Sequence, residues 1–222
     1  MEVIVEEKFW LQKWEKNEIA FHESEANPYL VKHFKELSLK KGARVFLPLC
    51  GKTNDIGWLL SKGYRVVGAE LSALAIEQLF KQLGLNPKIS VNGKLNHYQE
   101  NNIDIFVGNI FELSKNMIGP VDAIYDRAAL VALPGVMRNK YSLHLMEITH
   151  KAPQLLICYQ YDQSLAEGPP FSISDEEVNR HYSGSYDLLL LESMDVAGGL
   201  RGKYPAKERV WLLKNGRRFP SA

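Results

Sequence analysis

The sequence predicts a three-layer α/β fold in which helices cover both faces of a mostly parallel, Rossmann-like sheet. Short apolar segments alternate along the chain with longer segments whose apolar residues recur at helical spacing, as expected for a parallel sheet. In the clearest instance, an apolar run over residues 45–49 stops at Gly51, a helical segment follows, and a second apolar run ends at Glu70. Strand, tight loop, helix and strand in this order make a βαβ unit.

The length and composition fit a single domain over residues 1–222, with a helical cover over 1–40 and an α/β core over 43–214. The chain has 222 residues, of which 45% are hydrophobic, enough to bury a full core. Its formal net charge of +1 predicts no binding of nucleic acid or of an anionic membrane. No apolar run approaches the roughly twenty residues that span a bilayer, and the first residues lack the pattern of a secretory signal. We therefore expect a cytoplasmic protein, and we take it to be a monomer.

The two cysteines predict neither a disulfide nor a metal site. Cys50 and Cys158 lie in or at the end of predicted buried strands, where a small apolar residue is common. The sequence contains neither a catalytic triad nor a cluster of metal ligands. We expect two free thiols and no bound metal.

Two helices are predicted before the first strand. Residues 6–18 carry Trp10 and Trp14 near one helical face, and either packing or closure over a ligand explains two tryptophans at this spacing. A second helix is expected over residues 28–40. His22 lies in the loop between the two helices and has no assigned role.

The helix of the βαβ unit has clear start and stop signals. Asn54 and Asp55 offer side chains suited to a helix start, and the helix ends near Gly63. In such a unit the first loop faces a ligand, and an acid at the tip of the second strand accepts the ribose hydroxyls of a nucleoside. Glu70 follows Gly51 by about twenty residues, as this geometry requires.

Three cofactor classes compete for this loop. Residues 51–53, Gly-Lys-Thr, suggest a P-loop, but the glycine that opens such a loop would fall at Phe46. A dinucleotide fingerprint needs three glycines so that the backbone can approach a pyrophosphate, whereas this loop has one glycine and a proline. S-adenosylmethionine carries no phosphate and needs one small residue beside its amino-acid part and a ribose-binding acid. Gly51 and Glu70 fit it best, although many functions share this fold.

The next elements continue the alternation. Ser72 caps a helix that runs to Gly84. Residues 86–102, rich in Asn, Lys and Gly, form either an irregular insertion or a hairpin. A strand over residues 103–107 ends near Asn109, which either bonds an adenine edge or serves as a turn residue.

The fourth core strand covers residues 121–127 and ends in Asp126 and Arg127. Ligands of open α/β sheets bind beyond the carboxyl ends of the strands, so both side chains would face the site. An ion pair that closes the strand explains the two residues equally well. A helical segment follows, and Pro134 begins a longer helix.

The remaining segments complete the sheet. Residues 155–159 form a buried strand, and Ser174 with Glu177 makes a capping box for a short helix. Two further strands lie near residues 188–191 and 208–213.

Several short segments occur in a characteristic order along the chain. They are Trp14 with residues 19–22, then residues 48–52, 67–72, 126–134, 137–138 and 168–171. Together these segments resemble the thiopurine S-methyltransferase family, a branch of the class I S-adenosylmethionine-dependent methyltransferases. The resemblance covers residues 10–180 and fades beyond about residue 185.

The resemblance implies a class I methyltransferase fold with an antiparallel C-terminal edge strand, and S-adenosylmethionine as cofactor with S-adenosylhomocysteine as product. Trp14 would cover the cofactor, and Leu49 and Gly51 would contact its methionine part. Glu70 would bind the ribose. The family's bacterial members usually carry an acid at the position of Asn109, so its adenine contact would have altered hydrogen bonding.

For the acceptor, the resemblance implies an aromatic or heterocyclic thiol of the thiopurine type. Arg127 would lie near cofactor and acceptor and favour the anionic thiolate, which makes it the candidate catalytic residue. Its pKa is too high for a general base. Asp126 would orient Arg127 or lie near the cofactor cation. Phe21 and Pro170 would form the apolar acceptor wall.

Other functions stay open beside this one. The related plant halide/thiol methyltransferases act on small anions, and selenium or tellurium species are further candidate acceptors. A noncatalytic nucleoside-binding regulatory protein would share the fold but would have less reason to keep the acceptor wall. The near-neutral charge disfavours an RNA methyltransferase. We expect the loops 86–102 and 195–205 to decide the natural acceptor, with Arg201 as a candidate contact.

Overall fold

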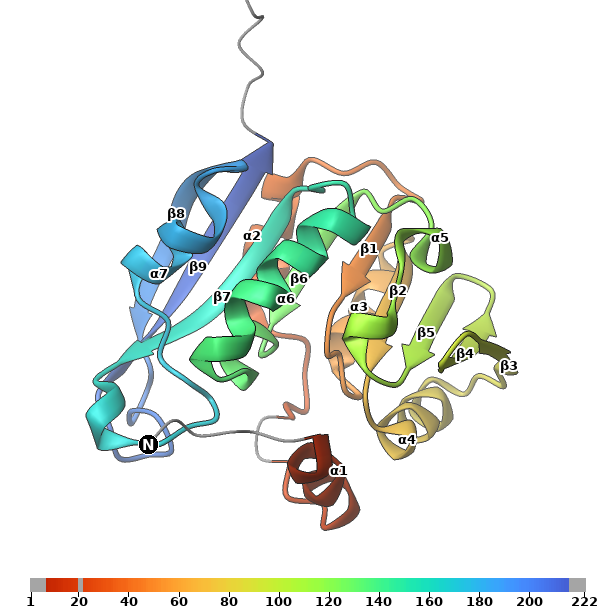
Figure 1. Cartoon of the computed structure of the whole chain (residues 1–222), viewed down its shortest axis with the longest axis horizontal. Coiled ribbons are helices and arrows are strands. Elements are labelled where there is room, and N and C mark those ends of the chain that lie inside the picture. Colours follow the sequence, from red (N-terminus) through yellow and green to blue (C-terminus); the bar gives the residue numbers. More distant parts are fainter. Residues whose placement is uncertain (1–6, 20–21, 216–222) are drawn as a thin grey trace, which may run out of the picture.

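The computed structural model describes residues 7–19 and 22–215. Its nine-stranded sheet has the order β3-β4-β5-β2-β1-β6-β7-β9-β8 (Figure 1). The five central strands are parallel to one another, which confirms the predicted mostly parallel sheet. These strands are β1 (Arg44–Leu47), β2 (Arg65–Glu70), β5 (Ile103–Val107), β6 (Ala123–Arg127) and β7 (Gln154–Tyr161).

Antiparallel strands extend the sheet on both sides. A hairpin of β3 (Lys88–Asn92) and β4 (Leu95–Glu100) pairs with β5, which decides between the two interpretations of residues 86–102. On the other side, β9 (Ala206–Asn215) runs antiparallel to β7, as expected of the C-terminal strand. It lies one position in from the edge, because β8 (Tyr186–Asp195) pairs with its outer side.

Helices cover both faces of the sheet and give the predicted three layers. The apolar side chains of neighbouring strand residues, such as Val45 and Phe46, belong to opposite core clusters, because successive side chains of a strand point to opposite faces. One face packs against α5 (Lys115–Ile118), α6 (Gly135–Ile148) and α7 (Asp175–Tyr182). The other packs against α2 (Pro28–His33), α3 (Asn54–Ser61) and α4 (Ala73–Leu83).

Two helix starts lie where the sequence predicts them, with details that the sequence did not show. Thr53 caps α3 by accepting a hydrogen bond from the Asp55 N–H, and Asp55 lies inside the first turn. Ser174 caps α7 by accepting a bond from the Glu177 N–H, but the Glu177 carboxylate does not complete a capping box. It pairs with Arg138 instead, because a buried carboxylate gains more from a guanidinium than from one more backbone N–H.

Two predicted helices are shorter in the structure. The helix expected over residues 28–40 consists of α2 and a 3₁₀ turn, Phe34–Leu37, which ends at Ser38 in a left-handed conformation. The helical segment after Arg127 is a single 3₁₀ turn, Leu130–Ala132. The helix over Ala73–Leu83 starts at Ser72 and ends at Gly84 as predicted.

The first helix, α1 (Glu7–Glu15), lies outside the three layers. In Figure 1 it lies beyond the end of the sheet, and among the helices named above it contacts α4. Trp14 is its one buried residue. This position places α1 across the carboxyl ends of the parallel strands, where the cavity described next opens.

Candidate active site

A large cavity lies at the carboxyl ends of the parallel strands. Its volume is about 670 Å³, and α1, the loops after β1, β2, β5 and β6, and the segments 168–170 and 196–201 line it. Every site residue predicted from the sequence and described by the structure is in this lining: Trp14, Leu49, Gly51, Glu70, Asn109, Arg127 and Pro170. The remaining predicted residue, Phe21, lies outside the described residues.

The loop after β1 is held in a tight conformation at the cavity. Leu49 and Gly51 have φ angles of 46° and 52°, which lie in the left-handed region. A Cβ atom on Gly51 would lie 2.9 Å from Cζ2 of Trp14, so the indole packs directly on the glycine backbone. Trp14 is only 5% exposed. Both explanations of this tryptophan, packing and cover, are therefore compatible with its position.

Glu70 connects the first loop to the end of β2. Its Oε2 accepts the Gly51 N–H at 2.8 Å, and its Oε1 accepts the Ser72 N–H at 2.9 Å. Burial raises the pKa of this carboxyl, and the backbone N–H groups of Ser72, Gly51 and Leu71 oppose the rise. Each oxygen has a further lone pair, so the carboxylate can still accept hydrogen bonds from a ligand.

Asn109 lies at the end of β5 and has two roles within the chain. Its Oδ1 accepts the Phe111 N–H at 2.8 Å and so caps the 3₁₀ turn Ile110–Glu112. Its Nδ2 donates to Glu7 at 2.6 Å, which ties α1 to the sheet. The role of a turn residue thus accounts for the hydrogen bond of the Asn109 Oδ1 atom. The residue also lines the cavity.

Arg127 lies deep in the cavity wall. Its side chain is 12% exposed and forms an ion pair with Glu23, which is 42% exposed. Burial opposes the charge of the guanidinium, but Glu23 and further acidic groups outweigh it and raise the pKa of Arg127. The arginine is therefore a permanent cation beside the cavity.

Asp126 does not face the cavity, which corrects the prediction that both residues at the end of β6 would do so. Successive side chains of a strand point to opposite faces, so only one of the pair can reach the site. Asp126 is fully buried in the core, where it accepts the Tyr141 hydroxyl at 2.7 Å and the Leu130 N–H at 3.1 Å. It is not among the residues that line the cavity.

Two short segments build an apolar wall across from the first loop. One is Val131–Leu133, after β6, and the other is Gly168–Pro170, after β7. The Phe171 N–H donates to the Val131 carbonyl at 2.7 Å and joins them. Arg201 also lines the cavity, and it donates to the Pro169 carbonyl at 2.7 Å.

The two loops expected to decide the acceptor differ in their positions. Val196, Leu200 and Arg201, from the loop 195–205, line the cavity. The segment 86–102, which the structure describes completely, contributes no lining residue, because its hairpin extends the far edge of the sheet. Its position therefore gives no support to a role in acceptor choice, which stays a prediction.

The sequence analysis missed several residues of the cavity. Tyr125 and Tyr159 line it from the ends of β6 and β7, and Tyr125 donates to Asp55 at 3.0 Å. His22 lines it as well, and burial followed by the charges of Lys52 and Arg127 lowers the pKa of its imidazole. The position of the tyrosines at strand ends was a usable signal, whereas nothing in the sequence marked His22.

Cys50 and Cys158 are free and buried, as predicted. Within the described residues, no group of three or more His, Cys, Asp and Glu side chains is arranged to hold a metal ion. None of the described helices is long and apolar enough to cross a bilayer.

Comparison with known proteins places this geometry in context. A family model described as thiopurine S-methyltransferase (TPMT) matches residues 5–215. A thiopurine S-methyltransferase of Xanthobacter autotrophicus is 50% identical over 211 residues, which cover 95% of this chain and 99% of the relative. One of Gluconobacter oxydans is 46% identical over 203 residues, which cover 91% and 92%.

Solved structures of methyltransferases share the fold. An S-adenosylmethionine-dependent methyltransferase of Anabaena variabilis superposes with a TM-score of 0.63 at 16% identity and covers 97% of both chains. A 1,6-didemethyltoxoflavin-N1-methyltransferase of Burkholderia thailandensis, solved with S-adenosylhomocysteine, has a TM-score of 0.64 at 11% identity and covers 96% and 94%. These structures confirm the predicted fold class.

Proposed function

This chain belongs to the thiopurine S-methyltransferase family, and from that premise we propose that it methylates the sulfur of an aromatic or heterocyclic, thiopurine-type thiol. It is an S-adenosylmethionine-dependent methyltransferase by its family and fold. One observation carries the choice of acceptor. A single cavity of about 670 Å³ joins Glu70 and Gly51 at one side with Arg127 and an apolar wall at the other.

The groups at the first side fit the cofactor. Glu70 keeps one lone pair on each oxygen, and these are the acceptors that two ribose hydroxyls need. We propose that Leu49 and Gly51 contact the methionine part, that Trp14 covers it, and that Asn109 lies against the adenine. S-adenosylmethionine, when bound, supplies a methyl group on a positively charged sulfur that needs no further activation.

The groups at the second side fit an anionic aromatic acceptor. The flat, apolar wall of Val131–Leu133 and Gly168–Pro170 suits a ring, and the proposal extends it with Phe21. Arg127 offers a fixed positive charge at the edge of this wall, so it stabilises a thiolate relative to the neutral thiol. Glu23 is much more exposed than Arg127. It can therefore turn toward solvent when an anionic acceptor takes its place.

The chain's residues then have mainly a positioning task. The thiol loses its proton to solvent, the thiolate sulfur forms the new bond to the methyl carbon, and the bond from that carbon to the cofactor sulfur breaks. The negative charge of the thiolate and the positive charge of the sulfonium cancel. No side chain needs to act as a nucleophile, because alignment of the two sulfurs with the methyl carbon supplies a large share of the rate enhancement.

The proposal also keeps the sequence-based expectations of a single domain that works as a monomer in the cytoplasm, without nucleic acid. The formal net charge of +1 supports the absence of a nucleic-acid partner. Size-exclusion chromatography with light scattering tests the oligomeric state, and a dimeric mass would contradict it.

An isotope-transfer assay tests the proposed reaction. The enzyme is incubated with S-adenosylmethionine labelled in its methyl group and with either an aromatic thiol or the matched phenol, in which oxygen replaces sulfur. We expect label on the thiol at a rate at least 100-fold above that on the phenol, because the thiol ionises near neutral pH. Equal rates, or cofactor binding without transfer to any thiol tested, would overturn the assigned acceptor class.

A further inference from the structure

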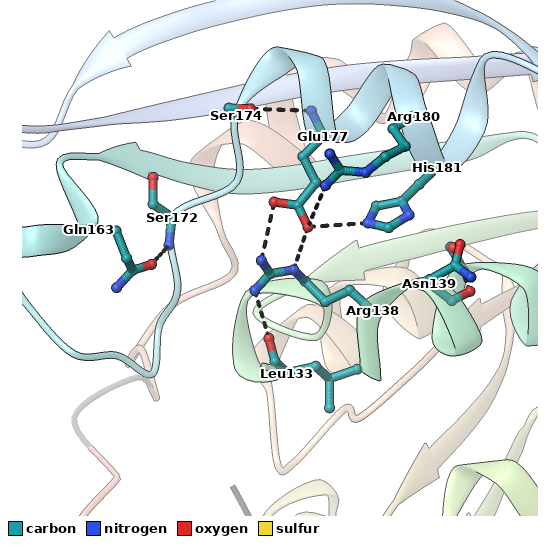
Figure 2. A network of polar contacts seen from close by, with 10 residues as sticks. Leu133, Arg138, Asn139, Gln163, Ser172, Ser174, Glu177, Arg180 and His181 are labelled. Carbon is teal, nitrogen blue, oxygen red and sulfur yellow. Dashed lines mark hydrogen bonds and ion pairs between the residues drawn. The ribbon is translucent and has the colours of Figure 1, made fainter. Parts of the chain in front are cut away.

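Arg138, on the first turns of α6, is the centre of a polar network behind the acceptor wall (Figure 2). Its side chain is 11% exposed, and it does not line the cavity. It nevertheless contacts one wall segment, the residue next to the other segment, and an acid on a third element. The inference drawn from it rests on the proposed function, because that function makes this wall the acceptor site.

The first contact reaches the wall segment after β6. Nη1 of Arg138 donates to the Leu133 carbonyl at 2.9 Å, and Leu133 lines the cavity. This carbonyl lies just past a 3₁₀ turn, where the backbone has no further helical hydrogen bonds to hold it. The guanidinium therefore fixes the end of the segment Val131–Leu133.

The second contact reaches Phe171, the residue that directly follows the wall segment after β7. The guanidinium lies over the ring of Phe171 at 5.8 Å from the centroid. Gly168 also packs against that ring. A Cβ atom added to Gly168 would lie 2.5 Å from Cδ1 of Phe171, so the ring lies directly on the glycine backbone. The ring is thus packed between the Gly168 backbone and Arg138. Pro169 and Pro170, which line the cavity, lie between this glycine and Phe171 in the chain.

Glu177, on α7, holds the guanidinium in this orientation. Its two oxygens lie 2.5 Å from Nε and 3.2 Å from Nη2 of Arg138. His181 Nε2 lies 3.2 Å from the same carboxylate, and Arg180 lies at 3.8 Å. Figure 2 shows the carboxylate in the middle of these groups, with Ser174 at the start of the helix. A carboxylate fixed in this way leaves the arginine little freedom to rotate.

We propose that Arg138 is a positioning residue that sets the gap between the two halves of the acceptor wall, and thereby the orientation of the acceptor ring. Planar geometry is essential to this task. One guanidinium serves the paired bonds to Glu177, the bond to Leu133 and the cation–π contact with Phe171 at the same time. A lysine ammonium carries the charge but cannot make this set of contacts.

Kinetics of Arg138→Met and Arg138→Lys test the proposal, with Arg209→Met as a matched control. Arg209 forms an ion pair with Asp175 of the same helix α7, but it contacts neither half of the wall. All three variants therefore weaken the anchoring of α7, and only the first two release the wall. We expect both Arg138 variants to raise the acceptor KM roughly tenfold or more, with the affinity for S-adenosylhomocysteine unchanged. Arg209→Met should leave the acceptor KM unchanged.

Hydrogen exchange provides a readout that does not depend on turnover. The Phe171 amide, bonded to the Val131 carbonyl, should exchange faster in Arg138→Met than in the wild type, and should not change in Arg209→Met. If Arg138→Met fails to fold, Glu177→Gln keeps the shape of the network while weakening its charge, and the same exchange shift is expected.

The outcomes separate this inference from the proposed function. An unchanged Phe171 exchange rate, an unchanged acceptor KM, or equal effects in the Arg138 and Arg209 variants would each overturn the positioning role. If the wild type methylates no thiol, the proposed function fails, and the exchange comparison still decides whether Arg138 fixes the wall.

Discussion

Replacing Asp126 by Asn tests the conclusion that this carboxylate belongs to the core. Asp126 is fully buried, and burial raises the pKa of its carboxyl from 3.8 to about 6, against the effect of bonds from Tyr141, Leu130 and Ala129. The folded protein therefore holds this proton more tightly than the unfolded chain does. The resulting contribution to stability is fully present below pH 3.8 and is lost as the pH rises through about 6.

The size of the effect follows from the two pKa values. A difference between 3.8 and about 6 corresponds to about 3 kcal/mol of unfolding free energy. Asparagine cannot titrate, and it preserves the geometry, because its oxygen can accept the Leu130 N–H and its amide can donate to the Tyr141 oxygen. Other buried acids, such as Glu70, titrate in both proteins and cancel in the comparison.

Urea unfolding at a series of pH values measures this difference. Relative to the wild type, Asp126→Asn should gain up to about 3 kcal/mol between pH 4 and pH 7. Its affinity for S-adenosylhomocysteine should stay within about twofold of the wild type, since Asp126 does not line the cavity. A difference in stability that does not vary with pH, or a large loss of ligand affinity, would refute the argument.

Three further substitutions test the cavity itself. Glu70→Ala should weaken S-adenosylhomocysteine binding roughly 100-fold, because two hydrogen bonds to a charged acceptor are worth about 3 kcal/mol together. An unchanged affinity in calorimetric titration would exclude the ribose-binding role. Arg127→Ala should lower turnover of an aromatic thiol about 100-fold or more, with a much smaller effect on cofactor affinity. Equal losses in turnover and affinity would make Arg127 a structural or cofactor residue. Gly51→Ala should lower the free energy of unfolding by about 1–2 kcal/mol in thermal denaturation and weaken cofactor binding, since φ is 52° and the new Cβ would collide with Trp14. Wild-type stability and affinity in this variant would contradict the described loop.

Local patterns were sufficient to predict the central part of the fold and one side of the site. The strand, loop and helix around Gly51 follow from apolar periodicity, which is a property of neighbouring residues. Glu70 and Gly51 then come together because β1 and β2 are adjacent and parallel, so their carboxyl ends meet at one edge. The sequence thus predicts the backbone and acid of the first side of the cavity.

Contacts between distant side chains could not be predicted in the same way. Glu23 pairs with Arg127 across 104 positions, and Arg138 pairs with Glu177 across 39. Neither pair has a local pattern, because their geometry depends on how complete elements pack. The error at Asp126 has a different cause: two adjacent polar residues end β6, and the apolar residues before them are buried on both faces. Alternation therefore could not indicate which of the two faces the site.

Calorimetric titration of S-adenosylhomocysteine into the wild type, and in parallel into Glu70→Ala and Asp126→Asn, tests the central claim most directly. The claim is that the cavity at the carboxyl ends of the strands holds the cofactor through Glu70. It predicts one binding site per chain in the wild type, roughly 100-fold weaker binding in Glu70→Ala and unchanged binding in Asp126→Asn. No binding to the wild type, or equal binding to all three proteins, would contradict it.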